Sequence, residues 1–256
     1  MNIAQYMTML LTQALPQTDN NIVIHEVSSN IKENNTAERT FAVFGKVDDE
    51  FVLIFVFYVT EYFVDGIVHL ELVDSLQYYN ELNRTELYHT ILLSYFYSCS
   101  LRGLKWTCFQ SCPPGDDACV FHDKASSQKQ LSKNRLLSWY HKMIIKGVNG
   151  GVFNGGCDMS ECRMDEIPHF LVSGEERDNE MIDRTTYFRV SLCSCQQQQS
   201  HSYETKSEHF DSIFYCNQEF MATCRSYNLS FATLESAKAA TRWIITCLEQ
   251  GFIPSQ

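Results

Sequence analysis

Residues 67–101, IVHLELVDSLQYYNELNRTELYHTILLSYFYSCSL, decide the fold, because they hold one clear strand followed by one clear helix. Residues 67–76 are rich in Val, Ile and Leu and alternate in polarity, which predicts a strand. Residues 85–101 carry apolar side chains at helical spacing, with Thr85 as the expected N-cap and Gly103 past the end. Together with the flanking pattern, this predicts an α/β fold with a central mixed sheet flanked by helices.

The start of this helix is a candidate phosphate site. The first amides of a helix have no partner within it, and the helix dipole is positive there. Arg84 would add a guanidinium group and Thr85 a hydroxyl donor. On spacing alone the plainer alternative stays open, in which Thr85 only caps the helix and Arg84 is a surface charge.

The rest of the chain continues the mixed pattern. Helices are expected over residues 3–15, 133–146 (closed by Gly147), 211–227 and 233–250. Strands are expected over residues 21–27, 39–44, 51–59, 105–111, 118–122 and 187–195. Residues 28–38 and 149–156 are expected to be loops, and residues 45–50 a hairpin turn. We expect a single domain over residues 1–256: a sheet and cofactor-binding part (1–146), an irregular glycine-rich and charged region (147–186), and a C-terminal strand with helices (187–256).

Composition narrows the classes of function. The 256 residues are 45% hydrophobic and 13% aromatic, enough for a sizeable core. A net charge of −11 argues against direct nucleic-acid binding and suits a basic partner, such as a lysine-rich protein tail. Neither a signal peptide nor a membrane-spanning run is visible, so we expect no membrane association. The eleven cysteines are irregularly spaced, which predicts reduced thiols and no metal site.

The helix expected over residues 133–146 carries a candidate acid. Its apolar stripe contains Trp139 and Tyr140. A tyrosine hydroxyl can protonate a departing thiolate. A core tyrosine whose hydroxyl bonds to a carbonyl would show the same pattern, so both interpretations stay open at this point.

Many short motifs in fixed order resemble the acetyltransferase domain of the CREB-binding protein family of histone acetyltransferases. The matching residues are Val73-Asp74-Ser75, Arg84-Thr85-Glu86-Leu87-Tyr88-His89, Ile91-Leu92-Leu93, Cys112-Pro113-Pro114, Gly115-Asp116-Asp117, Val120-Phe121-His122, Arg135-Leu136 and Trp139-Tyr140-His141-Lys142-Met143. Weaker similarity in residues 41–62, 166–170 and 229–248 extends the resemblance over nearly the whole chain.

The resemblance implies an acetyltransferase-like fold with a cleft for acetyl-coenzyme A as co-substrate. The implied contacts are Val73, Asp74 and Ser75 to pantetheine, Arg84 and Thr85 to phosphate, and Gln130, Arg135 and Trp139 along the rest of the cleft. Tyr140 falls on the family's general acid, which protonates the thiolate after a substrate lysine attacks the thioester. The implied role is a nuclear histone or protein-lysine acetyltransferase and transcriptional coactivator, whose partners are histone tails or other lysine-rich proteins and transcription factors.

Departures from the family pattern support a second hypothesis. Gln110 stands where the family has a Trp beside the reaction centre, and Ala118 lies where it has a Tyr. Leu171, Tyr215 and Gln218 align with acidic residues that receive a basic substrate side chain in the family. Lost aromatic surface would leave the thioester end of the cleft wetter. The alternative is therefore a catalytically impaired paralogue that serves as a coenzyme A-binding or protein-interaction module in transcription regulation.

Overall fold

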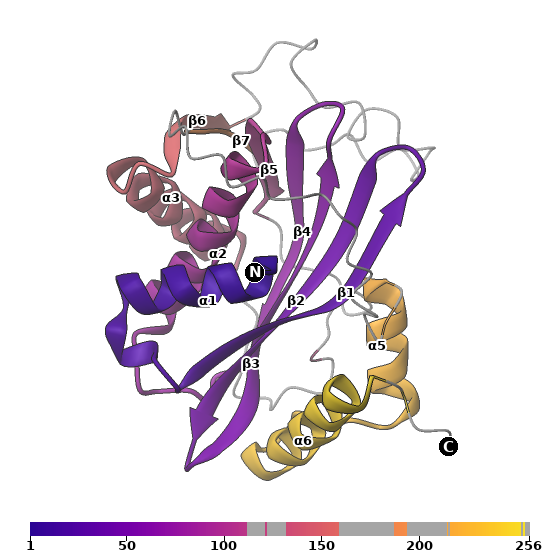
Figure 1. The fold of residues 1–256 in the computed structure, drawn as a ribbon. Coiled ribbons are helices and arrows are strands. Elements are labelled where there is room, and N and C mark those ends of the chain that lie inside the picture. Colours follow the sequence, from indigo (N-terminus) through magenta and orange to yellow (C-terminus); the bar gives the residue numbers. More distant parts are fainter. Residues whose placement is uncertain are drawn as a thin grey trace.

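A seven-stranded sheet runs through the centre of the computed structural model (Figure 1). The structure describes residues 1–111, 121, 132–158, 187–193, 214, 216–251 and 253, without the side chains of 156–158 and 217. The strands are β1 (Ile22–Lys32), β2 (Thr36–Val47), β3 (Glu50–Tyr62), β4 (Ile67–Ser75), β5 (Trp106–Gln110), β6 (Phe153–Asp158) and β7 (Tyr187–Leu192). Their order in the sheet is β1-β2-β3-β4-β5-β7-β6, and all neighbours are antiparallel except the parallel pair β4 and β5.

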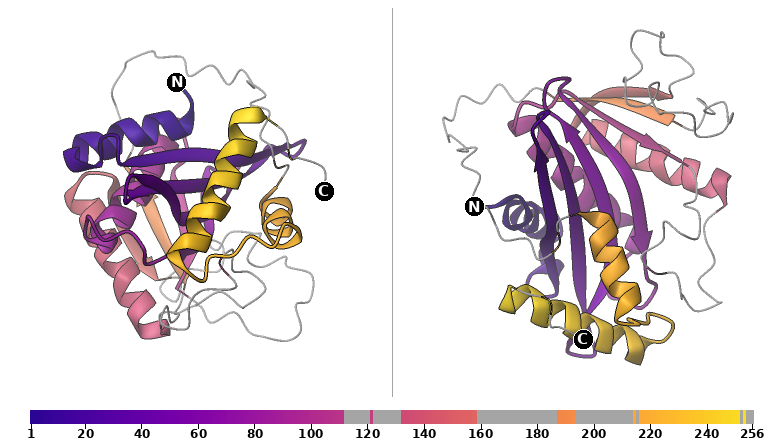
Figure 2. Two further views of the ribbon diagram at one scale, coloured as in Figure 1. Left: turned by 90° about the horizontal axis from the view of Figure 1, so that it is seen from below. Right: turned by 90° about the vertical axis from the view of Figure 1, so that its right-hand side faces the viewer.

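Helices cover both faces of this sheet (Figures 1 and 2). On one face lie α1 (Ile3–Ala14), α2 (Arg84–Leu101) and α3 (Lys133–Asn149), and on the other α5 (Asn217–Ser226) and α6 (Leu234–Gln250). A short 3-10 helix (Pro16–Thr18) follows α1. Helix α2 is the crossover that the parallel β4–β5 pair requires. The predicted fold class, a mixed sheet flanked by helices, is confirmed. Within the described residues, no helix combines the length and apolarity needed to cross a membrane.

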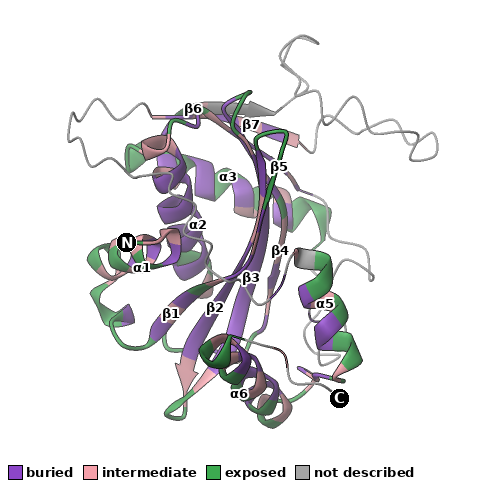
Figure 3. Cartoon of the chain, turned by 45° about the vertical axis from the view of Figure 1, so that its right-hand side comes forward, coloured by how far each residue is buried: buried purple, intermediate pink, exposed green. Residues whose placement is uncertain are grey.

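Strand β3 lies at the centre of the core. Its residues 52–59 are all at most 3% exposed. A strand covered on both faces has no polar side, so it reads as a continuous apolar run rather than an alternating one. Figure 3 shows the buried residues gathered along the central strands and the inward sides of α2 and α3. The predicted strand over residues 51–59 is confirmed and extended at both ends.

Two N-terminal boundaries were predicted wrongly. The expected loop over residues 28–38 is mostly strand, because β1 runs on to Lys32 and β2 begins at Thr36. A bulge after Glu26 shifts the register, and the buried Ser28 hydroxyl donates to the Thr40 hydroxyl of β2 at 2.6 Å. The β2–β3 turn is also shorter than expected: it consists of Asp48 and Asp49, which both have positive φ, as two-residue hairpin turns require.

Glycines caused the errors around residue 147. Gly147 does not close α3 but lies inside it, where an added Cβ would lie 2.3 Å from the Phe153 ring and 2.8 Å from Leu93. The expected flexible loop over residues 149–156 contains a turn at Gly151 (φ +70°) and then strand β6. Gly155 in β6 pairs with β7, so the main chain of this segment is held by the sheet.

Other boundaries differ only at their ends or lie outside the described residues. Strand β7 ends at Leu192 rather than residue 195, and α5 begins at Asn217 rather than residue 211. The strand expected over residues 118–122 falls outside the described part of the chain, Phe121 excepted.

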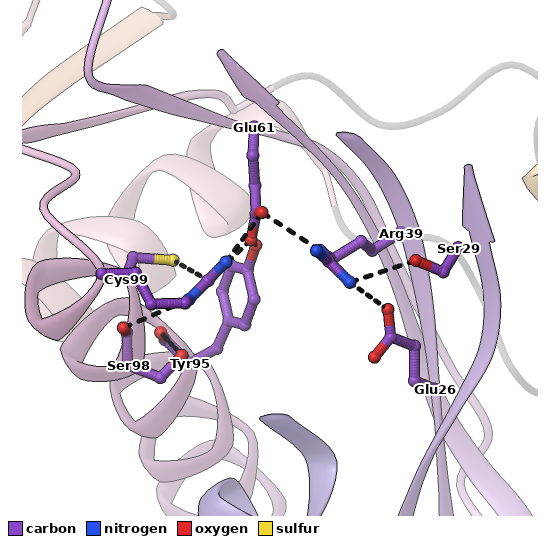
Figure 4. A network of polar contacts seen from close by, with 8 residues as sticks. Glu26, Ser29, Arg39, Glu61, Tyr95, Ser98 and Cys99 are labelled. Carbon is purple, nitrogen blue, oxygen red and sulfur yellow. Dashed lines mark hydrogen bonds and ion pairs between the residues drawn. The ribbon is translucent and has the colours of Figure 1, made fainter. Parts of the chain in front are cut away.

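A buried network of charged side chains ties α2 to the first three strands (Figure 4). Its centre is Glu61 on β3, whose side chain is fully buried. Arg102, just after α2, donates to both carboxylate oxygens at 2.6 and 2.7 Å, and Tyr95 of α2 donates at 2.7 Å. Arg39 of β2 donates to Glu61 at 3.0 Å and to Glu26 of β1 at 2.5 Å. The network fixes α2, and therefore its N-terminus, relative to the sheet.

Candidate functional site

Strands β4 and β5 part at one end of the sheet. Their pairing runs from Ile67 opposite Trp106 to Leu70 opposite Phe109. Beyond Leu70, β4 continues to Ser75 and pairs with β3 alone. The predicted cofactor contacts Val73 and Ser75 lie in this extension and are half-buried. The backbone of these residues is therefore free of β5, as a ligand lying along β4 would require.

Asp74 holds the backbone in this extension through hydrogen bonds. It is 5% exposed. One carboxylate oxygen accepts from the Ser75 amide at 2.9 Å and the other from the Phe121 amide at 3.1 Å. The Phe121 ring is buried against Phe231, with centroids 4.9 Å apart. Asp74 thus anchors the chain at Phe121 beside the end of β4, and so shapes a wall of the candidate site.

The N-terminus of α2 follows the loop after β4. The cap is Asn83, not Thr85 as predicted, because the Asn83 side chain accepts from the Glu86 amide at 3.2 Å. Arg84 and Thr85 are therefore the first two helical residues; Arg84 is half-buried and Thr85 exposed. Tyr88 fixes the helix start by donating to the carbonyl groups of Ile54 and Leu76, each at 3.3 Å. With the cap supplied by Asn83, the Thr85 hydroxyl is not needed to begin the helix.

Tyr140 is enclosed by aromatic rings from three elements. It is 3% exposed and stacks on Phe109 of β5, with ring centroids 4.7 Å apart. Trp139 meets it edge-on at 5.0 Å, and Phe188 of β7 lies at 6.4 Å. Burial raises the pKa of Tyr140 above its ordinary value of 10, so the hydroxyl stays protonated at neutral pH. Among the described residues, no carbonyl group accepts a hydrogen bond from this hydroxyl.

An aromatic residue next to Gln110, Phe109, packs on Tyr140. Gln110 lies at the end of β5 and is half-buried. Side chains alternate across a strand, so Phe109 faces Tyr140 and Gln110 the opposite side of the sheet. Sequence reasoning missed both Phe109 and Phe188. The alternating polarity of β5 and β7 predicts that both residues are buried, but it does not predict which ring they contact.

The other predicted residues are only partly placed. Arg135 is exposed in the first turn of α3, one helical turn before the half-buried Trp139. Gln218, one of the presumed replacements of the acidic pocket, is exposed in the first turn of α5. Gln130, Ala118, Leu171 and Tyr215 lie outside the described residues.

A cavity of about 370 Å³ lies between the β2–β3 turn and the loop before α2. Its lining includes Asp48, Asp49 and Glu81 with a single cation, Lys46, which is itself paired with Asp49 at 3.1 Å. This acidic lining does not suit a phosphate. The cavity is therefore no candidate for the phosphate site that the sequence predicts at the start of α2.

Comparisons with known proteins identify a family for this chain. A sequence model of the histone acetyltransferase domain KAT3 matches residues 26–168, more than half of the chain. Protein cbp-1 of Caenorhabditis elegans is 34% identical over 86 residues, 33% of this chain and 4% of that protein. Histone acetyltransferases HAC4 and HAC12 of Arabidopsis thaliana are 30% and 28% identical over 162 residues, which is 57% of this chain and 10% and 9% of theirs. The chain thus spans at most a tenth of these relatives. The crystal structure of Rtt109 from Aspergillus fumigatus aligns with 52% of this chain and 39% of that one, at 12% identity and a TM-score of 0.36.

Proposed function

Because this chain belongs to the KAT3 histone acetyltransferase domain family, we propose that it transfers an acetyl group from acetyl-coenzyme A to lysine side chains of proteins. The observation that carries the proposal is Tyr140, whose side chain is buried among aromatic rings beside the end of the β4–β5 pairing. Beyond this point β4 continues past the end of its pairing with β5, and α2 begins after it with Arg84 and Thr85.

In this proposal, groups from β4, α2 and α3 would hold acetyl-coenzyme A. Val73, Ser75 and the main chain of β4 would lie along pantetheine, in the extension that β5 leaves unpaired. The free amides at the start of α2, with the Arg84 guanidinium and the Thr85 hydroxyl, would hold phosphate. Trp139, and Arg135 one helical turn before it, would line the next part of the cleft, with Gln130 as a further contact.

Tyr140 would act as the general acid. The substrate amine forms a bond to the thioester carbonyl carbon, and the carbon–sulfur bond then breaks. Tyr140 donates its proton to the departing sulfur and is reprotonated by the proton that the new amide nitrogen releases. Because burial keeps its pKa high, the hydroxyl is in the acid form before each turnover. Phe109 and Trp139 keep water from the ring.

We further propose histone tails or other lysine-rich proteins as substrates, in the nucleus and in the service of transcription, with transcription factors as partners. The net charge of −11 supports a basic substrate. The names of the relatives, histone acetyltransferases of Arabidopsis thaliana, support the histone class.

A transfer assay tests the proposal. Histone H3 and H4 tail peptides would be incubated with radiolabelled acetyl-coenzyme A and the chain, its Tyr140→Phe variant, or a Tyr227→Phe control, in which the altered ring packs on Trp243. We expect transfer by the parent and the control, and a rate about 10²- to 10⁴-fold lower for Tyr140→Phe. Equal rates in the parent and Tyr140→Phe would refute the role of Tyr140. Binding of acetyl-coenzyme A without transfer would instead establish the alternative, a catalytically impaired binding module.

A further inference from the structure

His89 of α2 is a buried titratable residue that the mechanism above does not use. Its side chain is 3% exposed, and its Nε2 atom has no hydrogen-bond partner among the described residues. Its ring lies against the Trp139 indole, with centroids 4.4 Å apart and planes tilted by 59°. Burial, assisted by the nearby charge of Lys146, lowers the pKa of His89 to about 4, so the ring is neutral at physiological pH.

Two contacts join His89 to Trp139: the contact between the rings and a hydrogen bond between the imidazole and the Trp139 main chain. A buried nitrogen without a partner costs free energy, whereas an apolar ring of similar size would not. The contacts of His89 are thus to a residue of the candidate site, and the Trp139 indole also meets the Tyr140 ring. The position of His89 therefore bears on the site and not only on the core.

The two helices on either side of this contact are held firmly together. Lys146 of α3 donates to the Thr90 hydroxyl of α2 at 2.7 Å and forms an ion pair with Glu86. Gly147 lets α3 approach α2 closely, because a Cβ there would lie 2.8 Å from Leu93. His89 therefore presents its ring to Trp139 from a fixed backbone.

His89 also lies four residues after Thr85 on α2, so both side chains are on the same side of that helix, one turn apart. The contact thus links the start of α2 to the indole of α3 through a single ring. A shift of either helix would therefore change the position of one part of the candidate cofactor cleft, the start of α2, relative to the other, the Trp139 indole.

We propose that His89 is a positioning residue: its ring fixes the orientation of the Trp139 indole relative to the start of α2, so that one acetyl-coenzyme A molecule can contact both. The inference rests on the proposed function for the identity of the ligand. The orientation of Trp139 can be measured without it.

The test compares His89→Leu, which keeps volume but loses the ring, with His89→Phe, which keeps a ring but loses both nitrogens. Each is made in the full chain in a Trp106→Phe, Trp243→Phe background, so that Trp139 is the single tryptophan. The exposed His25, whose ring lies 5.8 Å from that of Phe44, provides the control variant His25→Leu. Circular dichroism checks that each variant is folded. Acrylamide quenching of Trp139 fluorescence and calorimetric titration with acetyl-coenzyme A are the readouts.

For His89→Leu we expect faster quenching of Trp139 without ligand and a dissociation constant for acetyl-coenzyme A that is about threefold to tenfold higher, the size of one lost aromatic pair. His89→Phe should restore both, and His25→Leu should change neither. Unchanged quenching in His89→Leu would overturn the proposal. So would weakened binding in His89→Phe with normal quenching, since that result assigns a direct contact from the imidazole nitrogen to the ligand. If the parent chain does not bind acetyl-coenzyme A, the proposed function fails, and the quenching result alone decides whether His89 positions Trp139.

Discussion

Replacing Glu61 with Gln should destabilise the fold strongly at neutral pH. Glu61 is fully buried and accepts from Arg102, Arg39 and Tyr95. The amide of Gln keeps the size of the side chain but removes its charge. Arg102 and Arg39 then remain buried beside a neutral group, and among the described residues a second carboxylate, that of Glu26, pairs with Arg39 alone.

Two estimates of the cost agree. Removing one partner of a buried ion pair costs about 3–5 kcal/mol. Independently, burial alone would raise the pKa of Glu61, but the charges of Arg102 and Arg39 outweigh burial and lower it from 4.5 to about 2. At about 1.4 kcal/mol per pKa unit, this difference corresponds to roughly 3 kcal/mol of folding free energy. Because the folded pKa is the lower one, the stabilisation is complete above pH 4.5 and is lost as the pH falls toward 2.

Urea denaturation of the parent chain and Glu61→Gln at pH 7 measures this difference, and a series down to pH 3 tests its sign. The control is Glu38→Gln, which breaks the partly exposed pair of Glu38 with Lys32 and should cost less than about 1 kcal/mol. We expect the penalty of Glu61→Gln to shrink as the pH falls below 4.5. A penalty equal to that of Glu38→Gln, or one that grows in acid, would refute the reasoning.

Two further predictions concern the surroundings of the site. Gly147→Ala should lower the free energy of unfolding by about 1–3 kcal/mol through overpacking against Phe153. Gly155→Ala, where an added Cβ meets nothing within 4 Å, should leave it unchanged. Equal shifts of the two variants in thermal denaturation would contradict the close approach of α3. Asp74→Ala should cost about 1–3 kcal/mol, because the buried Phe121 amide loses its acceptor. Hydrogen exchange should then accelerate at that amide, and an unchanged rate would show that Asp74 does not hold it.

Much of the fold follows from local sequence patterns. The apolar run of β3 and the apolar stripe of α3 identify these elements because burial itself requires such patterns. The polar side chains of residues 28–32 predict a loop when the sequence is taken alone. In the structure these residues form a strand, and the Ser28 hydroxyl bonds to Thr40 of the neighbouring strand. Gly147 likewise predicts the end of a helix, and Gly155 a loop, because the local sequence does not show what packs beside them. In the structure, Gly147 packs closely against Phe153 and Gly155 pairs with β7. Neither contact can be deduced from the residues next to the glycine.

The candidate site, too, could be predicted only in part from the sequence. The helix-start argument identified Arg84 and Thr85 as a possible phosphate site, and the resemblance identified Tyr140. The true cap, Asn83, was missed because it and Thr85 are both good cap residues two positions apart. The rings around Tyr140 and the contact of His89 with Trp139 could not be predicted, because strand and helix periodicity define a buried face but not the side chain that packs on it.

Calorimetric titration with acetyl-coenzyme A tests the central claim most directly. It compares the parent chain with Arg84→Ala and with Arg242→Ala, the latter an exposed arginine on α6 at 3.7 Å from Glu50. The account predicts saturable binding by the parent chain and by Arg242→Ala. For Arg84→Ala it predicts binding about 10- to 100-fold weaker, as expected for one lost charge-assisted contact to phosphate. No binding by the parent chain, or equal binding by Arg84→Ala, would contradict it.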